Sequence, residues 1–326
     1  MNEVTVIIPV YNAGRYLEES IRSVLNQTYP QWKMILVDDG STDESAIICD
    51  QYAESDERIE VIHQRNQGSF SAVGSGLRKT DTEFVMFLDA DDWYEPDMIE
   101  TMVQAAGEYG ADTVRCGYRK IYPDGHEEIP LPVETAIFEG TEIEDRILIP
   151  FFEEDANIYR RWSAARWDKI FRTDILQETY FKGNPKATIG EDLEMNLRYL
   201  AECRKAVSLD KHYMYCYRVM DSSLARGYSE KMRKQYEVLN QSIALIAADQ
   251  NRPYASRNKY EDINLLIMLT ELEHTKTISG TDRKIIRNQL ESQIHDKKIL
   301  LKKILNKNFP GKQVLQKVYR KLKNHS

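Results

Sequence analysis

Three carboxylates follow a short apolar run near residue 90 of the chain. Residues 83–88 read Glu-Phe-Val-Met-Phe-Leu and lead directly into Asp89, Ala90, Asp91 and Asp92. A continuous apolar run is typical of a parallel strand covered on both faces, and ligands of open α/β sheets bind beyond the carboxyl ends of such strands. Oxygen ligands without thiols suit Mg²⁺ or Mn²⁺. The acids therefore predict a divalent metal site, unless they only form a solvated loop that begins the next helix.

Two further apolar runs end in polar residues. Residues 34–37 lead into Asp38 and Asp39, and residues 4–8 lead into a loop that contains Pro9 and Tyr11. A helical pattern of apolar residues follows each run, which favours right-handed βαβ units and one parallel sheet. Because the carboxyl ends of parallel strands share one edge of a sheet, Tyr11, Asp39 and the three acids are expected to lie together. This arrangement predicts a nucleotide pocket with a metal beside it.

The order and spacing of these motifs resemble glycosyltransferase family 2. The resemblance rests on residues 4–12, 25–30, 37–43 and 88–92, and it continues more thinly to about residue 225. It implies an α/β GT-A fold with a mostly parallel central sheet flanked by helices, followed here by a helical C-terminal region. It also implies a UDP-sugar donor, a divalent metal (Mn²⁺ or Mg²⁺) and an inverting reaction.

The resemblance also implies roles for individual residues of the first half. Those expected to bind the nucleotide are Pro9, Tyr11, Asp39, Asn66, Asp89 and Ala90. Tyr11 would stack near the uracil, and Asp39 would hydrogen-bond to its edge. Asp91 would hold the metal, and Asp92 would share in the metal site or contact the substrate.

Glu191 and Asp192 lie in a segment, residues 188–196, that resembles the Glu-Asp motif of the family. The resemblance makes Asp192 the general base, which removes the proton of the acceptor hydroxyl as its oxygen attacks the anomeric carbon. Glu191 would contact the substrate. The alternative is that both acids only begin a helix, where negative charge favours the positive end of the helix dipole. The two interpretations are compatible.

Residues 66–77 depart from the family pattern. Val73 and Gly74 stand where the family carries an Arg-Asn pair, so one donor contact is in doubt unless Arg65 or Arg78 supplies the charge. The glycines of this segment do not form the G-x-G-x-x-G pattern of dinucleotide sites.

Three more candidates for substrate contacts lie in the second half. Trp167 and Lys169 resemble the W-x-K segment of the family, where a Trp face suits a sugar ring and Lys suits a phosphate or an acceptor oxygen. The alternative there is a packed helix–loop junction with one ion pair. Arg218 resembles a residue of the acceptor-side loop and would contact the pyrophosphate, unless it is an ordinary surface Arg.

Composition predicts a soluble cytoplasmic enzyme. The chain has 326 residues, of which 42% are hydrophobic, and no apolar run approaches the length of a transmembrane helix. Four cysteines without metal or redox spacing indicate reduced core thiols. We expect a catalytic domain at 1–225, with a nucleotide half at about 1–110 and an acceptor half at about 111–225. A helical region would follow at 226–296, and a basic tail at 297–326.

The tail has ten Lys or Arg residues and no acid, on helices with an apolar stripe. Such a basic amphipathic segment predicts binding to an anionic membrane surface, although docking on the acidic body or on a partner is the alternative. The enzyme would then be peripheral at the inner face of the cell membrane. The helical region is assigned to packing, homo-oligomer formation or acceptor positioning, and no nucleic-acid partner is expected.

These interpretations predict an inverting, metal-dependent glycosyltransferase that moves a sugar from a UDP-sugar to a growing polysaccharide or lipid-linked glycan. Two alternatives remain. One is a non-catalytic partner subunit that keeps the GT-A fold, which only Val73 and Gly74 favour. The other is a sugar nucleotidyltransferase, whose usual Gly-rich loop after the first strand is missing at residues 9–14.

Overall fold

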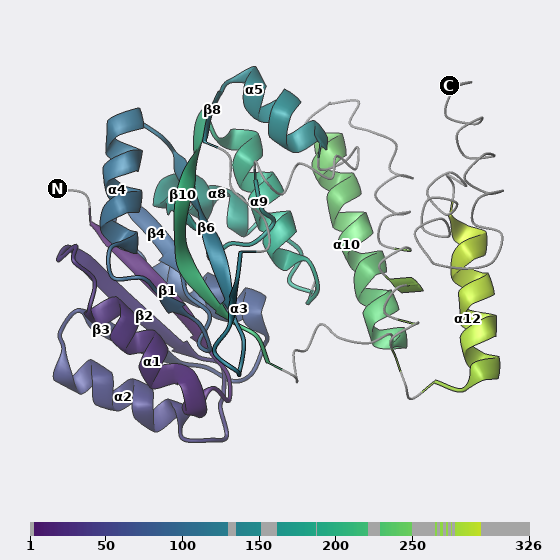
Figure 1. Ribbon diagram of the computed structural model, residues 1–326, viewed down its shortest axis with the longest axis horizontal. Helices are drawn as coiled ribbons and strands as arrows, with labels where there is room; N and C mark the ends of the chain where they lie inside the picture. Colours follow the sequence, from purple (N-terminus) through teal and green to yellow (C-terminus); the bar gives the residue numbers. More distant parts are fainter. Residues whose placement is uncertain are drawn as a thin grey trace. The chain divides into compact units, whose positions relative to one another are not determined.

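The computed structural model describes residues 3–129, 135–150, 162–186, 188–220, 229–249 and 278–294, together with residues 265, 268, 269, 272 and 275. The chain divides into two compact units. The first, the sheet unit, contains residues 1–150 and 155–221, and the second, the helical unit, contains residues 151–154 and 222–326. All candidate site residues belong to the sheet unit, whose main strands and helices are labelled in Figure 1.

The sheet unit alternates strands and helices through its first half, as predicted, and mixes short elements after β6. Its elements in chain order are β1 (Val4–Val10), α1 (Gly14–Leu25), β2 (Trp32–Asp38), α2 (Ser45–Ser55), β3 (Ile59–His63), α3 (Ser69–Lys79), β4 (Phe84–Phe87), β5 (Trp93–Tyr94), α4 (Met98–Tyr109), β6 (Thr113–Ile121), β7 (Glu127–Glu128), β8 (Ala136–Glu139), α5 (Thr141–Ile143), the π-helix η1 (Glu144–Leu148), β9 (Lys169–Arg172), α8 (Thr173–Tyr180), α9 (Glu191–Glu202) and β10 (Lys205–Arg218).

Within the described residues these strands form one sheet of ten strands, with the order β3-β2-β1-β4-β9-β6-β10-β5; β7 pairs with β6 and β8 with β10. The four strands β3, β2, β1 and β4 are parallel, as predicted. β9 is antiparallel to both of its neighbours, β4 and β6, whereas β10 is parallel to β6. The first residue of β9 therefore lies near the carboxyl end of β4.

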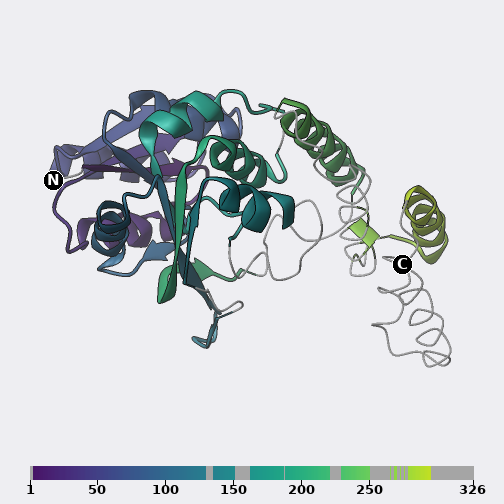
Figure 2. The ribbon, with the colours of Figure 1, turned by 90° about the horizontal axis from the view of Figure 1, so that it is seen from above.

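Helices cover both faces of the sheet, which explains the continuous apolar pattern of the strands (Figure 2). In β1, Val4, Val6 and Ile8 belong to the core that also contains buried residues of α1 and α4. Ile7 faces α3 on the other side, where a Cβ at Gly76 would lie only 2.7 Å from Ile7 Cγ2. All four cysteines are buried and free, as predicted.

The helical unit contains α10 (Glu230–Asp249) and α12 (Gly280–Gln293). Along α10, Leu239, Ile243 and Ile246 are buried and form an apolar stripe. Ser279 is the N-cap of α12, since its Oγ accepts from the Asp282 N–H at 3.1 Å. The whole of the basic tail predicted at 297–326 lies outside the described residues. Among the helices that are described, none is long and apolar enough to cross a membrane.

Candidate active site

Three loops meet at the carboxyl ends of β1, β2 and β4. The Asp39 N–H donates to the Val10 carbonyl at 2.8 Å, which places the loop after β2 against the loop after β1. The Leu88 N–H donates to the Ile7 carbonyl at 3.1 Å, which brings the acidic loop after β4 to the same edge. The predicted juxtaposition of the three polar loops is therefore confirmed.

The loop after β1 presents Tyr11 to solvent, and Pro9, near the end of β1, is half-buried. Tyr11 is 53% exposed, so its ring is free to receive a flat partner. The next residue, Asn12, has φ of 51°, and its side-chain oxygen accepts from the Thr42 N–H at 2.8 Å. The Asn12 N–H in turn donates to Ser41 Oγ at 3.0 Å. These bonds fix the loop that carries Tyr11 to the loop after β2.

Asp39 is buried and organises the segment ahead of α3. One of its oxygens accepts from the Gln67 N–H at 2.9 Å and from the Gln64 side chain at 2.7 Å, and the other accepts from the Gly68 N–H at 2.8 Å. Asn66, in the same segment, is exposed. Both Asp39 oxygens are therefore engaged within the protein, and a bond to uracil would share or replace one of these contacts.

The three acids after β4 differ in their surroundings. Asp92 is 1% exposed; Tyr215 Oη donates to its Oδ2, and the Arg218 N–H donates to its Oδ1, both at 2.7 Å. The Asp89 N–H donates to the same Tyr215 hydroxyl at 3.3 Å. Because its two oxygens already bind β10, Asp92 supports the loop, and the expectation that it joins the metal or substrate is not met by this geometry. Asp89 and Asp91 are half-buried, and Ala90 between them is buried.

Arg218, expected at the pyrophosphate, makes contacts within the protein. Its Nε donates to the Asp91 carbonyl at 2.8 Å, and its Nη2 donates to Glu19 Oε2 at 2.5 Å. The guanidinium also lies over the rings of Tyr16 and Trp93, 4.8 and 4.6 Å from their centroids. Arg218 thus ties the end of β10 to the acidic loop and α1, because these acceptors and rings already surround its guanidinium.

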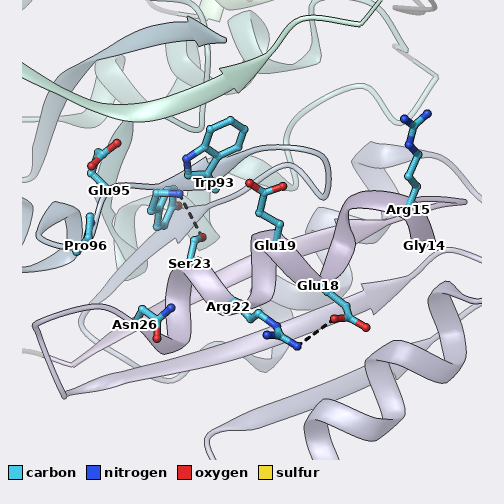
Figure 3. A pocket seen from close by; sticks show the side chains of 11 residues that line it. Gly14, Arg15, Glu18, Glu19, Arg22, Ser23, Asn26, Trp93, Glu95 and Pro96 are labelled. Carbon is cyan, nitrogen blue, oxygen red and sulfur yellow. Dashed lines mark hydrogen bonds and ion pairs between the residues drawn. The ribbon is translucent and has the colours of Figure 1, made fainter. Parts of the chain in front are cut away.

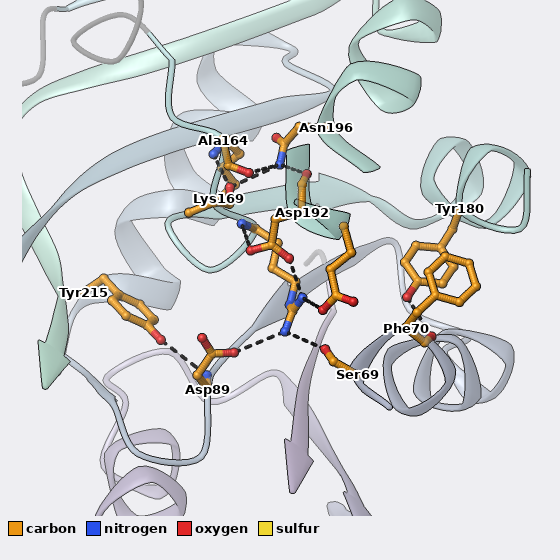
Figure 4. A network of polar contacts seen from close by, with 12 residues as sticks. Ser69, Phe70, Asp89, Ala164, Lys169, Tyr180, Asp192, Asn196 and Tyr215 are labelled. Atoms are coloured by element: carbon orange, nitrogen blue, oxygen red, sulfur yellow. Dashed lines mark hydrogen bonds and ion pairs between the residues drawn. The ribbon is translucent and has the colours of Figure 1, made fainter. Parts of the chain in front are cut away.

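A buried guanidinium joins the acidic loop to the expected base. Arg166 Nη1 binds Asp192 Oδ1 and donates to Glu191 Oε1 at 3.3 Å. Its Nη2 donates to Asp89 Oδ1 at 3.3 Å and to Ser69 Oγ at 3.2 Å. Ser69, Asp89 and Asp192 come from α3, the loop after β4 and α9, and they converge in Figure 4. Sequence reasoning placed Asp89 and Asp192 at one site but missed Arg166.

The electrostatics of this cluster reflect burial and excess negative charge. Burial raises the pKa of Asp89 to about 6, and the neighbouring charges of Asp192 and Asp91 add to this rise, while Arg166 opposes it. Burial likewise raises the pKa of Glu191, again against Arg166 and with Asp192. A bound cation would reverse this tendency, because it favours the ionised carboxylates.

Lys169, expected to touch a phosphate or an acceptor oxygen, is completely buried. Its ammonium donates to Asp168 Oδ1 at 2.6 Å and to Ser163 Oγ at 2.8 Å, and it also binds the Ala165 carbonyl. Arg115 donates to the other Asp168 oxygen at 3.2 Å. All three ammonium protons thus have protein acceptors. Lys169 therefore braces the 163–168 segment, and the expectation of a substrate contact is not met in this structure.

Trp167, the other residue of this segment expected at a sugar, is half-buried. It stacks on Tyr215 with ring centroids 4.2 Å apart and an interplanar angle of 20°, and Tyr118 meets it edge-on at 4.9 Å. One of its faces therefore supports the tyrosine that holds the acidic loop.

The departure at Gly74 has a packing explanation, and the neighbouring Val73 is buried. A Cβ at Gly74 would lie 3.3 Å from the Phe181 ring and 3.4 Å from the Tyr180 ring, so glycine lets α3 approach these aromatics closely. Arg78, expected to supply charge to the nucleotide region, instead lies over the Phe181 ring at 4.5 Å. The guanidinium that binds the carboxylates of Asp89, Glu191 and Asp192 belongs to Arg166, rather than to Arg65 or Arg78.

The oxygen donors of Asp89 and Asp91 fit a divalent metal. No group of three His, Cys, Asp or Glu side chains forms a ready-made metal site in the part of the chain that the structure describes. Mg²⁺, however, is commonly bound by one or two carboxylates together with substrate phosphates. Two neighbouring carboxylates at a strand end provide that kind of partial site.

A cavity of about 650 Å³ lies beside the acidic loop, between α1 and residues 93–96 (Figure 3). Its walls combine Trp93 with the acids Glu18, Glu19 and Glu95 and with basic residues of α1. Glu19 is also the partner of Arg218, so the cavity borders the loop that carries Asp91.

Comparison with known proteins decides the family. The profile described as Glycosyl transferase family 2 matches residues 5–166, which extend from β1 to Arg166. The chain belongs to glycosyltransferase family 2. Glycosyltransferase GlyA of Streptococcus pneumoniae serotype 4 is 30% identical over 258 residues, which are 76% of this chain but 35% of GlyA. This glycosyltransferase thus spans about a third of the length of that relative.

Solved structures show the fold. The structure of S. aureus TarS 1-349 in complex with UDP-GlcNAc matches with a TM-score of 0.63 and 19% identity, and covers 91% of this chain and 82% of TarS 1-349. The mannosyltransferase PcManGT from Pyrobaculum calidifontis, in complex with GDP-Man and Mn²⁺, matches with a TM-score of 0.56 and 16% identity over 91% of this chain and 82% of its own. This family 2 glycosyltransferase therefore has the predicted GT-A fold.

Proposed function

We propose that this glycosyltransferase moves a sugar from a UDP-sugar to a hydroxyl of a growing polysaccharide or lipid-linked glycan, with inversion at the anomeric carbon. One observation carries the proposal: Arg166 binds both Asp89 of the acidic loop and Asp192 of α9. Asp89 is a candidate ligand of the metal and the phosphates, and Asp192 is the candidate base. The two side chains therefore face the same small space. The UDP-GlcNAc complex of TarS supports the choice of uridine nucleotide.

On this proposal the three loops at the sheet edge hold the donor. The exposed ring of Tyr11 stacks on the uracil, and Asp39 with the Asn66 segment lines its edge. Asp89 and Asp91 hold a divalent metal, as the Mn²⁺ complex of PcManGT supports. When bound, the metal neutralises charge on the leaving diphosphate.

Asp192 is the proposed base. It lies in the first turn of α9 and is half-buried, so a carboxylate there is reachable from the acceptor side. It accepts the proton of the acceptor hydroxyl while the oxygen of that hydroxyl forms a bond to the anomeric carbon. The bond from that carbon to the diphosphate oxygen breaks, and UDP leaves on the opposite face. A single displacement of this kind inverts the configuration.

We further propose that the enzyme acts at the cytoplasmic face of the cell membrane. The support is the basic amphipathic sequence at 297–326, which lies outside the described residues. A lipid-linked acceptor would be presented at that surface.

A donor screen tests the proposed reaction. UDP-glucose, UDP-galactose, UDP-GlcNAc, UDP-GalNAc and UDP-glucuronate are each incubated with the full chain and Mn²⁺, and UDP release is measured. We expect release from one or two donors. A non-catalytic partner subunit would bind UDP in calorimetry without releasing it from any donor. A nucleotidyltransferase would instead form a UDP-sugar from UTP and a sugar phosphate.

Asp192→Asn tests the base directly. The amide keeps the shape of the side chain but loses basicity, so transfer is expected to fall by about 10²- to 10⁴-fold. UDP affinity, measured by calorimetry, should change little. Unchanged turnover would indicate that Glu191 is the base. The other nearby acid, Glu194, is 3% exposed and pairs with Arg198.

A further inference from the structure

Arg166 is the most highly connected buried cation of the candidate site. Its side chain is 9% exposed, and its two terminal nitrogens bind Asp89, Glu191, Asp192 and Ser69. These partners come from three separate elements. Planar guanidinium groups suit such bridging, because their N–H donors diverge in fixed directions from one plane.

Arg166 engages both oxygens of Asp192. The guanidinium binds Oδ1, and the Arg166 backbone N–H donates to Oδ2 at 3.4 Å. A carboxylate held at two points from one residue has little freedom to rotate. The direction in which Asp192 faces the acidic loop is therefore set by where residue 166 lies.

The position of residue 166 is itself fixed by buried polar contacts. The Asn196 side chain donates to the Ala164 carbonyl and to the Asp192 carbonyl, both at 2.9 Å, and so joins α9 to the loop before β9. The Ala165 carbonyl also accepts from the Asn196 side chain at 3.2 Å, and it binds the Lys169 ammonium. The loop and the first turn of α9 thus form one braced unit around the guanidinium.

We propose that Arg166 is a positioning residue that orients Asp192 toward the donor bound at Asp89 and Asp91. This inference deepens the proposed function and rests on it. Without the guanidinium, the carboxylates of Asp89, Glu191 and Asp192 would face one another across the site. Their repulsion would turn Asp192 away from the reacting hydroxyl. With it, the base and the acidic loop keep a fixed separation while the donor binds.

The first test is Arg166→Lys, which keeps the charge but not the planar fork. An ammonium cannot bridge the same partners in the same geometry, and small misplacements of a catalytic group cost about 10²-fold in rate. We expect kcat with the best donor of the screen to fall by about 10- to 100-fold, while the donor KM changes by less than about threefold. A merely structural effect would alter both values or the melting temperature. An unchanged kcat would overturn the inference.

Arg198→Lys is the matched control. The Arg198 side chain is 10% exposed, close to the 9% of Arg166, and its Nε donates to Glu194 on α9 at 3.1 Å. The substitution removes the planar fork from another ion pair of α9 and does not touch Asp192. Its kcat is expected to stay within about twofold of the wild type. A loss equal to that of Arg166→Lys would show that any damage to α9 lowers kcat, and it would overturn the positioning role.

The double variant Arg166→Lys/Asp192→Asn separates a role through Asp192 from an independent one. If Arg166 acts by orienting Asp192, its replacement has nothing further to disturb once the base is gone. The double variant should then match Asp192→Asn within about twofold in kcat. If the losses of kcat in the two single variants instead multiply in the double variant, Arg166 acts independently of Asp192, which would contradict the proposal.

A melting cycle on the ligand-free protein provides a readout besides activity. Arg166→Met should lower the melting temperature, because it leaves carboxylates without their counter-charge. Adding Asp192→Asn to that variant should recover part of the loss, since it removes one of those charges. If the changes in melting temperature of the two single variants simply add in the double variant, Arg166 and Asp192 are not coupled. If the wild type releases UDP from no donor, the proposed function fails, while this cycle still decides whether Arg166 and Asp192 are coupled.

Discussion

Two neighbouring aspartates in the acidic loop have opposite surroundings. The Asp92 carboxylate receives hydrogen bonds from the Tyr215 hydroxyl and the Arg218 backbone and is 1% exposed. Asp91 is only half-buried, and its pKa is raised by burial. A carboxylate whose bonds are all internal holds structure, whereas one that is left partly open can bind a cation.

The paired variants Asp91→Asn and Asp92→Asn should therefore fail in different ways. Asp91→Asn is expected to unfold at the same urea concentration as the wild type but to lose Mn²⁺-dependent UDP binding. Asp92→Asn is expected to lower the free energy of unfolding by about 1–3 kcal/mol, because an amide NH2 replaces one of the two buried oxygens that accept hydrogen bonds. Calorimetry with UDP and urea titrations measure both effects. Full Mn²⁺-dependent affinity in Asp91→Asn would rule out its role at the metal.

Whether a site residue could be predicted depended on the kind of strand that carries it to the site. Tyr11, Asp39 and Asp89 directly follow apolar strands, so their common position results from parallel pairing alone. Arg166 and Lys169 flank the start of an antiparallel strand, and no periodicity shows which neighbours such a strand chooses. One signal for Arg166 was available. Acids from three motifs require a cation nearby, and residues 160–169 carry four basic side chains, of which Arg166 lies between the two tryptophans.

At the scale of elements, His63 connects three of them. Its Nδ1 lies 3.0 Å from Asp38 Oδ2 at the end of β2, and its Nε2 lies 2.9 Å from Asp50 Oδ1 on α2. The hydrogen bonds to Asp38 and Asp50 raise the pKa of His63, despite the opposing effect of burial. A protonated imidazole donates to both carboxylates at once.

The stability that His63 contributes should depend on pH in a defined direction. Because its pKa is higher in the folded protein, the contribution is fully present below the unfolded value of about 6.5 and is lost as pH rises through the folded value. The side chain is 45% exposed, so we expect less than about 1 kcal/mol. Urea unfolding of wild type and His63→Gln at several pH values measures it, with exposed His212→Gln as control. A difference between wild type and His63→Gln that stays constant with pH would contradict the pairing.

The packing of α3 on β1 allows a second test at this scale. Gly76→Ala would place a Cβ 2.7 Å from Ile7 Cγ2, whereas a Cβ at Gly107 on α4 meets nothing within 4 Å. We expect Gly76→Ala to destabilise the protein by about 1–3 kcal/mol through overpacking. Gly107→Ala should stabilise it by up to about 1 kcal/mol, because alanine favours the helix. Melting temperatures that rise in both variants would show that α3 moves aside freely.

The elements of the first half could be predicted more completely than those of the second. β1, β2 and β4 are apolar runs with both faces covered, so the sequence pattern and the burial agree along each strand. β10 is different, because its pairing with β6 shifts register after Ser208 and Lys211 has φ of 62°. Irregular pairing of this kind depends on tertiary contacts that alternation in the sequence does not encode.

At the scale of the whole molecule, the sequence beyond residue 296 still supports a membrane test. Truncation after Asp296 is expected to leave UDP affinity unchanged but to abolish binding to vesicles that contain anionic lipid. Binding by the full chain should weaken as salt rises, because charges are screened beyond about 8 Å at physiological ionic strength. Vesicle flotation with anionic and neutral lipids measures the vesicle binding of the truncated chain and the salt dependence of binding by the full chain. A lower melting temperature with vesicle binding retained would show instead that the tail packs on the protein.

The position of β9 in the sheet also affects how the protein folds during its synthesis. β9 pairs with β4, since Arg172 lies opposite Phe84 and Ile170 opposite Met86. A ribosome adds about 5–20 residues per second, so β4 emerges several seconds before its partner on that side. During that interval a growing chain carries an apolar strand with one open edge, the kind of surface on which proteins aggregate. A chaperone that shields this edge until Arg172 has emerged would therefore affect the yield of folded enzyme more than its final stability.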